Sequence, residues 1–510
     1  MTARIYLSAA LSGLLFALAF PPAAMAWLAP VALTPWILAL WRENGRARAV
    51  LSGVVFGLVF WCVSVPWISF VVTHFGGQPG WMGAICVFLL ALILAEWPAI
   101  VAGVVVLAFP SRSAWRFVAF PVAWMASEHA RAYAYKGFPW NLTANALALH
   151  PVWIQTASWW GAFGVGALVA GFAAACGAIL AAPTAVKKLR IAGGALAAVA
   201  ALWAFGFARL RAPESGTPVR VACLQPNIPQ TVREDPDLVA ANYVKVLTLA
   251  GEAAASRPDL ILIPESSFYG LEWSRSPTLR RDLGAVSAEG QSAILFNDVD
   301  EMPDGRYFNA ARLLTPAGMS ATTYHKVHLV PFGEYVPLPK LFFFMHEISK
   351  IIGAFTAAKS PVLLTSGALA LGPAVCYEMT YPSLARDEAR MGANLLVSVS
   401  NDAWYGRAGA QAQHLRAMPL RAVEVGRPFV RAAITGISAA VDSRGRMLAG
   451  LPENREGIVR ATVRLESGAT VWSRWGGVVF PAASDAAVVC MVVWGFVRWR
   501  RPSSKRVRYE

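Results

Sequence analysis

The chain has 510 residues, of which 56% are hydrophobic and only 15% are charged, whereas charged residues make up about a quarter of an ordinary soluble domain. This composition excludes a simple soluble enzyme. The net charge of +15 would suit binding to nucleic acid or anionic lipid, but the basic residues gather in short loops between apolar runs, which is typical of topogenic charge in membrane proteins.

Eight apolar stretches have the length of a membrane span, or nearly so. They are Ile5–Phe20, Ala26–Trp41, Val50–Val72, Trp81–Phe109, Phe117–Met125 with its flanks, Val152–Ala182, Ile191–Leu210 and Val478–Trp499. The first could be a signal peptide with a weak cleavage-like site before Ala26. Because a second apolar run follows at once, a helical hairpin is the better interpretation. The sequence thus predicts a polytopic α-helical membrane bundle of about eight spans.

The basic residues assign a side of the membrane to each loop. Alternate connections, together with both ends of the chain, hold fifteen basic residues, and the opposite connections hold only Arg131 and Lys136. Because Lys and Arg concentrate in cytoplasmic loops, both termini are expected in the cytoplasm. Residues 1–210 then form a bundle of seven spans, and residues 211–477 lie on the outer side. A C-terminal transmembrane helix at 478–499 and a basic cytoplasmic tail at 500–510 follow.

Residues 218–466 have the pattern of a soluble α/β domain. Strands are predicted at Val219–Asn227, Leu260–Pro264, Ser292–Asn297, Ala310–Thr315, Lys326–Glu334, Leu371–Cys376, Asn394–Val399, Pro428–Ala433 and Ser438–Val441. Helices are predicted at Asp237–Ala255, Arg280–Glu289, Pro382–Gly392 and Ala410–Gly426. Strands that alternate with helices favour a layered α/β domain whose sites lie at strand ends.

One apolar run does not suit a soluble surface. It consists of Leu341, Phe342, Phe343, Phe344 and Met345, shortly after the predicted strand at Lys326–Glu334. A core strand is one interpretation. The interpretation that we favour is a loop that dips into lipid or covers an acyl-chain pocket.

Three chemically active side chains lie at the ends of predicted strands. Cys376 ends one apolar run, Glu265 ends another, and Lys326 ends the segment Tyr324-His-Lys326 ahead of Val327–Glu334. A cysteine attacks acyl carbons as thiolate, and Glu265 can take its proton and return one to a leaving group. Lys326 suits a fixed positive charge beside a developing oxyanion, with the backbone N–H of Tyr377 as a second donor.

Further acidic residues and histidines lie near these three in the sequence. Glu334 can orient Lys326 or complete the proton path, and Glu378 can shape the site. A Cys–His arrangement stays open through His325, His328 or His414. Neighbouring residues of an extended strand point to opposite sides, so His325 and Lys326 cannot both face the site. Each of these residues could also be purely structural, for example a buried thiol or a surface charge.

The cysteine pattern argues against disulfides and metal. The six cysteines, at positions 62, 86, 176, 223, 376 and 490, form no C-x-x-C pair, so neither a disulfide framework nor a zinc site is suggested. A phosphate-cradling glycine loop is not evident either. We therefore expect no cofactor and no metal.

The residues around the three chemical groups resemble a known family. Pro264-Glu265-Ser266, the run from Tyr324 to Pro337 and Cys376-Tyr-Glu378 are similar to motifs of the bacterial apolipoprotein N-acyltransferases, membrane-embedded members of the nitrilase or carbon–nitrogen hydrolase superfamily. Gly137-Phe-Pro-Trp140 and the segment around Gln413-His-Leu415 are similar as well. The resemblance covers essentially the whole chain, and the long lysine motif is its most specific part.

The resemblance implies a fold, a reaction and a location. The fold is an αββα sandwich on a membrane bundle in the bacterial inner membrane, with the catalytic domain on the periplasmic side. A phospholipid would donate a fatty acyl chain to the enzyme thiol, and the thioester would pass it to the α-amino group of the diacylglyceryl-cysteine of a lipoprotein. Neither nucleic acid nor a cofactor is involved.

Roles in this reaction are implied for individual residues. Glu265 would be the base, Lys326 the stabiliser and Cys376 the nucleophile, with Glu334, Tyr377 and Glu378 in support. The apolar run at 341–345 corresponds to a mobile lid region of the family.

Three segments depart from the family pattern and leave recognition of the acceptor open. A tryptophan is expected near Glu234, an asparagine at Ile434, and a small-aromatic pattern at Asn141–Asn145. Two other enzymatic functions therefore stay in view, a membrane-anchored amidohydrolase of the same superfamily and an acyltransferase with a different amine acceptor. A non-catalytic lipid-binding scaffold is the third alternative.

Overall fold

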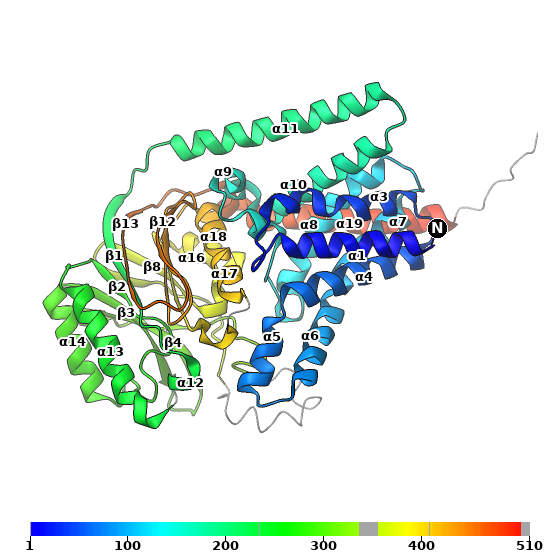
Figure 1. Ribbon diagram of the computed structural model, residues 1–510. Coiled ribbons are helices and arrows are strands. Elements are labelled where there is room, and N and C mark those ends of the chain that lie inside the picture. The colour runs from blue at the N-terminus through cyan, green and yellow to red at the C-terminus, as the bar shows by residue number, and fades with distance from the viewer. Residues whose placement is uncertain (1, 234, 336–354, 407–408, 501–510) are drawn as a thin grey trace, which may run out of the picture.

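The computed structural model describes residues 2–233, 235–335, 355–406 and 409–500. Long helices occupy one end of the molecule, and two β-sheets with their helices occupy the other (Figure 1). The helical part contains the segments before residue 212 and the C-terminal helix, and the sheets lie between residues 217 and 465.

The helical part is built from long helices joined by short ones. Before the sheets it contains α1 (Thr2–Leu18), η1 (Ala26–Leu28), α2 (Ala29–Ala32), α3 (Thr34–Arg42), α4 (Arg46–Ser64), α5 (Trp67–Phe70), the π-helical η2 (Val71–Phe75), α6 (Gly80–Leu94), α7 (Glu96–Ala108), α8 (Trp115–Tyr133), η3 (Ala134–Lys136), η4 (Thr143–Leu147), α9 (Pro151–Ile154), α10 (Ala157–Ala181) and α11 (Ala185–Arg211). After the sheets come the π-helical η8 (Trp472–Gly476) and α19 (Gly477–Arg500).

Five helical segments within the described residues are long and apolar enough to cross a bilayer. They are Arg46–Ser64, Gly80–Ala108, Ala157–Ala181, Ala185–Arg211 and Trp472–Trp499, with Ala3–Leu18 as a shorter apolar helix. This count differs from the eight spans that the sequence predicts. The predicted span at Ala26–Trp41 is interrupted, because Pro30 and Pro35 each begin a new helix. The one around Phe117–Met125 lies in α8, which buries Arg116, Glu128 and Arg131.

Other predicted span ends also need correction. Helix α4 ends at Ser64 rather than at Val72, because the residue before Pro66 is biased away from helical angles. The segment 81–109 consists of two helices that meet at Ala95. Helix α10 is broken at Gly161, whose φ is 68°. A side chain at Gly161 would lie 2.6 Å from the Trp472 ring, so the break gives η8 its place against α10.

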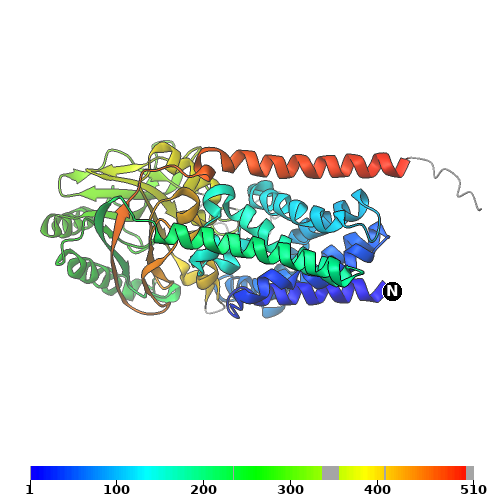
Figure 2. The ribbon, with the colours of Figure 1, turned by 90° about the horizontal axis from the view of Figure 1, so that it is seen from above.

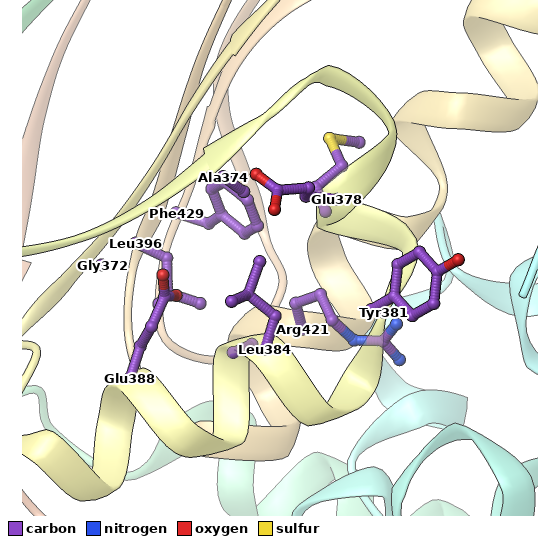
Figure 3. A pocket seen from close by; sticks show the side chains of 11 residues that line it. Gly372, Ala374, Glu378, Tyr381, Leu384, Glu388, Leu396, Arg421 and Phe429 are labelled. Carbon is purple, nitrogen blue, oxygen red and sulfur yellow. The ribbon is translucent and has the colours of Figure 1, made fainter. Parts of the chain in front are cut away.

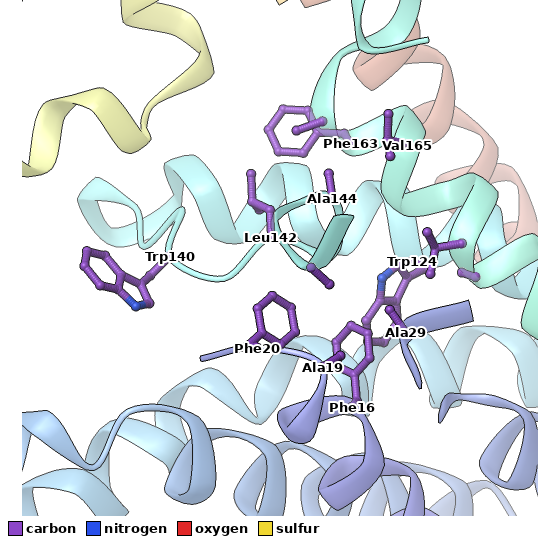
Figure 4. Close-up of a cluster of buried hydrophobic side chains, with 14 of the residues drawn as sticks. Phe16, Ala19, Phe20, Ala29, Trp124, Trp140, Leu142, Ala144, Phe163 and Val165 are labelled. Carbon is purple, nitrogen blue, oxygen red and sulfur yellow. The ribbon is translucent and has the colours of Figure 1, made fainter. Parts of the chain in front are cut away.

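The bundle has an aromatic core that α1 and α8 share. Figure 4 shows Phe16 and Phe20 facing Trp124, with Leu142 and Phe163 nearby. The rings of Phe16 and Trp124 meet edge to face at 5.9 Å. This core continues into the sheet end of the molecule. By contrast, α11 runs outside the bundle in Figure 1, and in Figure 2 it crosses in front of the other helices. Gly206 is its one buried residue.

The sheets are mixed, with parallel strands at their centres. The first has the order β13-β1-β2-β3-β4-β5, with β6 paired to β4, and the second has the order β12-β11-β10-β9-β8-β7. The strands of the first are β1 (Thr217–Gln225), β2 (Leu260–Leu262), β3 (Ala293–Glu301), β4 (Tyr307–Thr315), β5 (Gly318–Met319), β6 (Tyr324–His325) and β13 (Gly457–Leu465). Those of the second are β7 (Leu364–Ser366), β8 (Leu369–Val375), β9 (Leu395–Ser400), β10 (Phe429–Ala433), β11 (Ser438–Val441) and β12 (Met447–Leu451).

Two helical layers cover the outer faces of the two sheets. Alternate side chains of β1 point in opposite directions: Val221 joins the core between the sheets, and Ala222 packs toward the helices. Helices α13 (Pro236–Ala254) and α14 (Pro277–Gly290) cover the first sheet. Helices α16 (Pro382–Met391) and α18 (Ala417–Val425) cover the second sheet and pack on the bundle. Short helices are α12 (Gln230–Arg233), η6 (Cys376–Thr380), η7 (Asp402–Tyr405) and α17 (Ala410–Leu415).

Most predicted elements of this layered domain are present, with ends that differ by up to four residues, and two predictions fail. The first strand, for example, begins at Thr217 and ends at Gln225, two residues earlier at each end than predicted, and β3 ends at Glu301, four residues later. The predicted helix at Ala410–Gly426 is two helices that meet at Arg416. The predicted strand at Lys326–Glu334 is wrong. Strand β6 ends at His325. In the following segment the backbone N–H groups donate hydrogen bonds to the carboxylates of Glu378 and Glu334 and not to a neighbouring strand.

Candidate active site

Glu265, Lys326 and Cys376 each lie where a strand has ended, as the sequence predicts. Glu265 comes three residues after β2, Lys326 directly follows β6, and Cys376 directly follows β8. These residues are only 7%, 1% and 7% exposed. Strands β2 and β6 belong to the first sheet and β8 to the second, so the site joins the two sheets.

Two donors hold the Glu265 carboxylate in one orientation. Oε1 accepts from the side-chain amide of Asn309 at 2.9 Å, and Oε2 accepts from the backbone N–H of Asn401 at 2.9 Å. Asn309 lies in β4 and Asn401 directly follows β9. One residue from each sheet therefore fixes this carboxylate.

Lys326 forms a buried ion pair with Glu334. Its Nζ lies 3.0 Å from Oε1 and 2.9 Å from Oε2 of Glu334. Burial disfavours the charge, but the nearby Glu334, Glu265 and Cys376 together raise the pKa of Lys326 well above its usual value. Lys326 is therefore a permanent ammonium ion, which suits the stabilisation of negative charge rather than proton transfer.

Asn309 joins the two acidic residues, and the sequence analysis missed it. Its Nδ2 donates to Glu265 Oε1 at 2.9 Å and to Glu334 Oε1 at 2.7 Å, and its Oδ1 accepts from Asn297 Nδ2 at 2.6 Å. Asn297 is itself oriented, because its Oδ1 accepts from the backbone N–H of Ser266. A buried amide within the apolar strand β4 was the available signal, since buried polar groups need partners.

Cys376 occupies a strained turn. Its φ is 55°, a left-handed angle that costs a residue other than glycine about 1–3 kcal/mol. Burial raises the pKa of the Cys376 thiol to about 12, Glu265 adds to this effect, and Lys326 opposes it. The thiol is therefore close enough to both charges to sense them, and it is protonated at rest.

Glu378 ties this turn to the segment after Lys326. Its Oε1 accepts from the backbone N–H groups of Val327 and His328 at 2.6 and 2.9 Å. Its Oε2 accepts from the Tyr324 hydroxyl at 2.9 Å and from the N–H of Val375 at 2.8 Å. Burial raises the pKa of Glu378 to about 7, against Lys326 and the backbone donors. Glu378 thus connects the turn at Cys376 with the segment after Lys326.

The structure separates the candidate histidines from the thiol. His325 points away and pairs with Asp300 at 2.7 Å, which agrees with the predicted opposition to Lys326. His328 stacks on Tyr381, with ring centroids 3.9 Å apart. His414 lies closest, but its Nε2 contacts the backbone oxygen of Cys376 at 3.1 Å. Among the described residues no histidine hydrogen-bonds to the Cys376 sulfur, so the arrangement does not support a Cys–His pair.

A further buried acid lies behind the turn at Cys376. Glu388 of α16 is 1% exposed, and its Oε1 has no hydrogen-bond partner among the described residues. Burial and the neighbouring Glu378 raise its pKa well above the usual value, which favours the neutral form of Glu388. It borders a cavity of about 10 Å³, which holds about one water molecule. Figure 3 shows Glu378 and Glu388 on opposite sides of this cavity.

The helical bundle touches the site through Gln413. Its Oε1 accepts from the indole N–H groups of Trp67 and Trp140 at 3.3 and 2.7 Å. Its Nε2 donates to the carbonyl oxygens of Pro21 and Ser64, both at 2.7 Å. All four partners belong to the bundle, and Gln413 lies in α17 of the sheet domain.

Aromatic and charged contacts extend this junction. The Trp140 ring lies 6.2 Å from that of Tyr377, which is 5% exposed. Arg421 and Glu424 pair at 2.5 Å, and Glu424 accepts from the backbone N–H of Ala162 at 2.7 Å. The sheet domain is thus joined to the bundle by buried, directional contacts.

Some predicted residues lie outside the described part of the chain. These are the apolar run Leu341, Phe342, Phe343, Phe344 and Met345, the departure at Glu234, and the basic tail after Arg500.

Two family models match the chain. Residues 12–175 match the apolipoprotein N-acyltransferase N-terminal domain, and residues 220–471 match the carbon-nitrogen hydrolase family. The two matches correspond to the helical part and to the part with two sheets.

Several proteins are similar over nearly their whole length. An apolipoprotein N-acyltransferase of Geobacter metallireducens is 36% identical, over 96% of this chain and 95% of its own. One of Vibrio cholerae is 29% identical over 92% and 93%, and one of Allorhizobium ampelinum is 32% identical over 91% and 90%. Among solved structures, an amidase from a Nesterenkonia species matches with a TM-score of 0.39 at 21% identity, over 52% of this chain and 96% of its own.

Proposed function

Because the chain belongs to the apolipoprotein N-acyltransferases, we propose that it moves a fatty acyl chain from a phospholipid to Cys376 and then to the N-terminus of a lipoprotein. The acceptor is the α-amino group of a diacylglyceryl-cysteine. The observation that carries the proposal is the convergence of Glu265, Lys326 and Cys376 in one buried site that contacts a bundle of apolar helices.

In the first step the thiol of Cys376 attacks an ester carbonyl of the phospholipid. Glu265 takes the sulfur-bound proton, a C–S bond forms, and the carbonyl oxygen becomes an oxyanion. Lys326 and the backbone N–H of Tyr377 stabilise that charge. The ester C–O bond then breaks, and the lysophospholipid leaves with the proton that Glu265 returns. The enzyme is left as a thioester.

In the second step the amine of the lipoprotein attacks the thioester carbon. Glu265 takes a proton from the amine, a C–N bond forms, and the same two donors stabilise the second oxyanion. The C–S bond breaks and the sulfur regains a proton. A thiol suits both steps, because a thioester is reactive enough for an amine, provided that water is excluded.

The supporting residues keep charges and atoms in place. Glu334 pairs with Lys326 and so fixes the ammonium ion beside the thiol. Glu378 holds the nucleophile turn against the lysine segment. Burial of the thiol, with a pKa of about 12, keeps it unreactive until Glu265 takes its proton. The apolar run at 341–345 would cover the acyl chain.

The proposed topology completes this picture. We place eight crossing segments in the membrane, seven within residues 1–210 and one at 478–499, with both termini in the cytoplasm. The catalytic domain, residues 218–466, then lies in the periplasm above the inner membrane. The asymmetry of fifteen basic residues against two supports this sidedness.

Mass spectrometry of the purified enzyme tests the reaction. Incubation with phospholipid should add one acyl chain to Cys376, and a diacylated lipopeptide should then remove it and gain an N-terminal amide. Cys376→Ala should form no adduct, whereas the matched control Cys490→Ala, which lacks an exposed thiol on α19, should behave like the wild type. Release of ammonia from small amides without acyl transfer would instead identify an amidohydrolase.

A further inference from the structure

His414 holds the carbonyl group of the nucleophile from behind. The ring is fully buried, and its Nε2 lies 3.1 Å from the backbone oxygen of Cys376. The Trp140 ring packs on it with centroids 5.3 Å apart. The imidazole is therefore confined between the bundle and the nucleophile turn, with little freedom to turn away.

The neighbours of His414 select one tautomer. A carbonyl oxygen only accepts, so Nε2 must carry the proton that binds Cys376. Nδ1 then accepts from Arg431 Nη2 at 3.0 Å. Asp402 also faces Nδ1 at 3.1 Å and pairs with Arg431 at 2.5 Å. Burial lowers the pKa of His414 even though Asp402 opposes the shift. The Nε2–H donor is present in this neutral tautomer and in the protonated ring alike.

The hydrogen bond from His414 to the Cys376 oxygen determines the direction of the next backbone N–H. In a trans peptide the C=O and the following N–H point in opposite directions within one plane. Fixing the Cys376 oxygen on His414 therefore turns the Tyr377 N–H to the opposite side of that peptide. Tyr377 lies in the first turn of η6, where N–H groups lack partners within the helix.

We propose that His414 is a positioning residue for acyl transfer, which fixes the Cys376–Tyr377 peptide so that the Tyr377 N–H faces the developing oxyanion. It acts through the backbone and does not take the proton of the thiol. The φ of Cys376 is a left-handed 55°. Such an angle persists only when neighbouring groups hold it, and without the hydrogen bond from His414 the turn would relax and rotate this peptide. The inference rests on the proposed thioester reaction.

Two reactions of the same thiol separate this role from that of a base. Acylation by phospholipid forms an oxyanion, whereas alkylation by iodoacetamide needs the thiolate but no oxyanion donor. The test measures both rate constants in the full-length enzyme, together with the phospholipid concentration that gives half-maximal acylation. The variants are His414→Phe, which keeps a ring without a donor, and His414→Gln, whose amide places an N–H near the position of Nε2.

We expect His414→Phe to acylate about 10²–10³-fold more slowly, the usual effect of losing one oxyanion donor. Its alkylation rate and half-saturating phospholipid concentration should stay within about twofold of the wild type, and His414→Gln should recover most of the acylation rate. If His414→Phe does not fold, His414→Asn replaces it, because its shorter amide cannot reach Cys376.

Three results would overturn the inference. The first is wild-type acylation by the variant that lacks the donor. The second is an equal loss of acylation and alkylation, which would indicate a base. The third is no recovery with glutamine in a folded protein. A wild-type enzyme that forms no thioester at Cys376 would refute the proposed function itself, and these variants would not be needed to show it.

Discussion

Replacing Glu378 by glutamine changes one atom and disrupts the connection between the two catalytic segments. All four partners of the carboxylate are donors, two on each oxygen. A glutamine must direct its NH₂ group toward one of these pairs. Turned toward Val327 and His328, the NH₂ group faces two donors and both hydrogen bonds are lost. Turned toward Tyr324 and Val375, it loses the bond from the Val375 N–H, whereas the Tyr324 hydroxyl can rotate to accept.

The cost follows from the better of these two orientations. A hydrogen bond to a charged group contributes about 1.5–3 kcal/mol, so one lost bond, with the others weakened by the loss of the charge, corresponds to about 3 kcal/mol before the segment relaxes. We expect a loss of about 3 kcal/mol in the free energy of unfolding. For a domain of this size that lowers the melting temperature by roughly 6–12 °C, and acylation should fall with it, because Val327 and Val375 flank the lysine and the nucleophile.

Glu388→Gln is the matched control. Glu388 is equally buried and borders the same cavity as Glu378 (Figure 3). Its raised pKa favours the neutral form, and its Oε1 has no hydrogen-bond partner within the described part of the chain. Glutamine therefore resembles its native form and has no proton to keep at pH 8, so the melting temperature should equal that of the wild type or rise. Thermal unfolding of both variants in detergent at pH 8 provides the comparison. Equal destabilisation by the two changes, or none by Glu378→Gln, would refute the reasoning.

Three further outcomes follow from the buried polar groups. Because the pKa of Glu388 is raised, the folded chain keeps a proton that the unfolded chain releases near pH 4.5, and this contribution to stability is lost as the pH rises toward the folded pKa. The unfolding free energy of Glu388→Gln relative to wild type should therefore rise over that window by up to about 1.4 kcal/mol per pH unit. Melting curves at several pH values measure this difference, and a difference that does not change with pH would contradict a neutral Glu388. Asn309→Leu removes a hydrogen-bond donor from both Glu265 and Glu334. Because a hydrogen bond to a charged group contributes about 1.5–3 kcal/mol, thioester formation should slow by about tenfold to a hundredfold. An unchanged rate in a single-turnover assay would contradict this. Gln413→Leu leaves four buried partners unsatisfied and should lower the melting temperature by more than about 5 °C; an unaltered melting curve would show that these contacts contribute little.

The chemical residues could be predicted because local sequence carries their signal. Glu265 and Cys376 end runs of apolar residues, and Lys326 stands directly before another such segment. Segments of this kind predict strands whose ends present side chains together. The residues that hydrogen-bond to these three have no comparable signal in the local sequence. Asn309 is one polar residue inside an apolar strand, and its two carboxylate neighbours are 44 and 25 residues away. Contacts of that kind follow from the tertiary fold and not from local pattern.

The errors have physical causes of the same kind. The segment after Lys326 alternates apolar and polar residues as a strand does, but its backbone donors bind the carboxylates of Glu378 and Glu334. The hydropathy pattern cannot show that these carboxylates, and not a neighbouring strand, accept the backbone hydrogen bonds. The segment at 26–41 is apolar enough for a span, but Pro30 and Pro35 divide it into short helices, so a crossing there is made by a broken helix and not a continuous one.

The junction of bundle and sheet domain explains why the two parts share one chain. A flexible tether would concentrate the enzyme at the membrane, but it would not fix any catalytic atom. Here Gln413 is bound by four groups of the bundle, and the next residue, His414, holds the carbonyl of Cys376. Because α17 places both side chains, a shift of the bundle against this helix would move the nucleophile's own peptide plane. The helical part thus has a second task beside access to lipid, which is to define the direction from which the thiol and its oxyanion donor meet the acyl carbon.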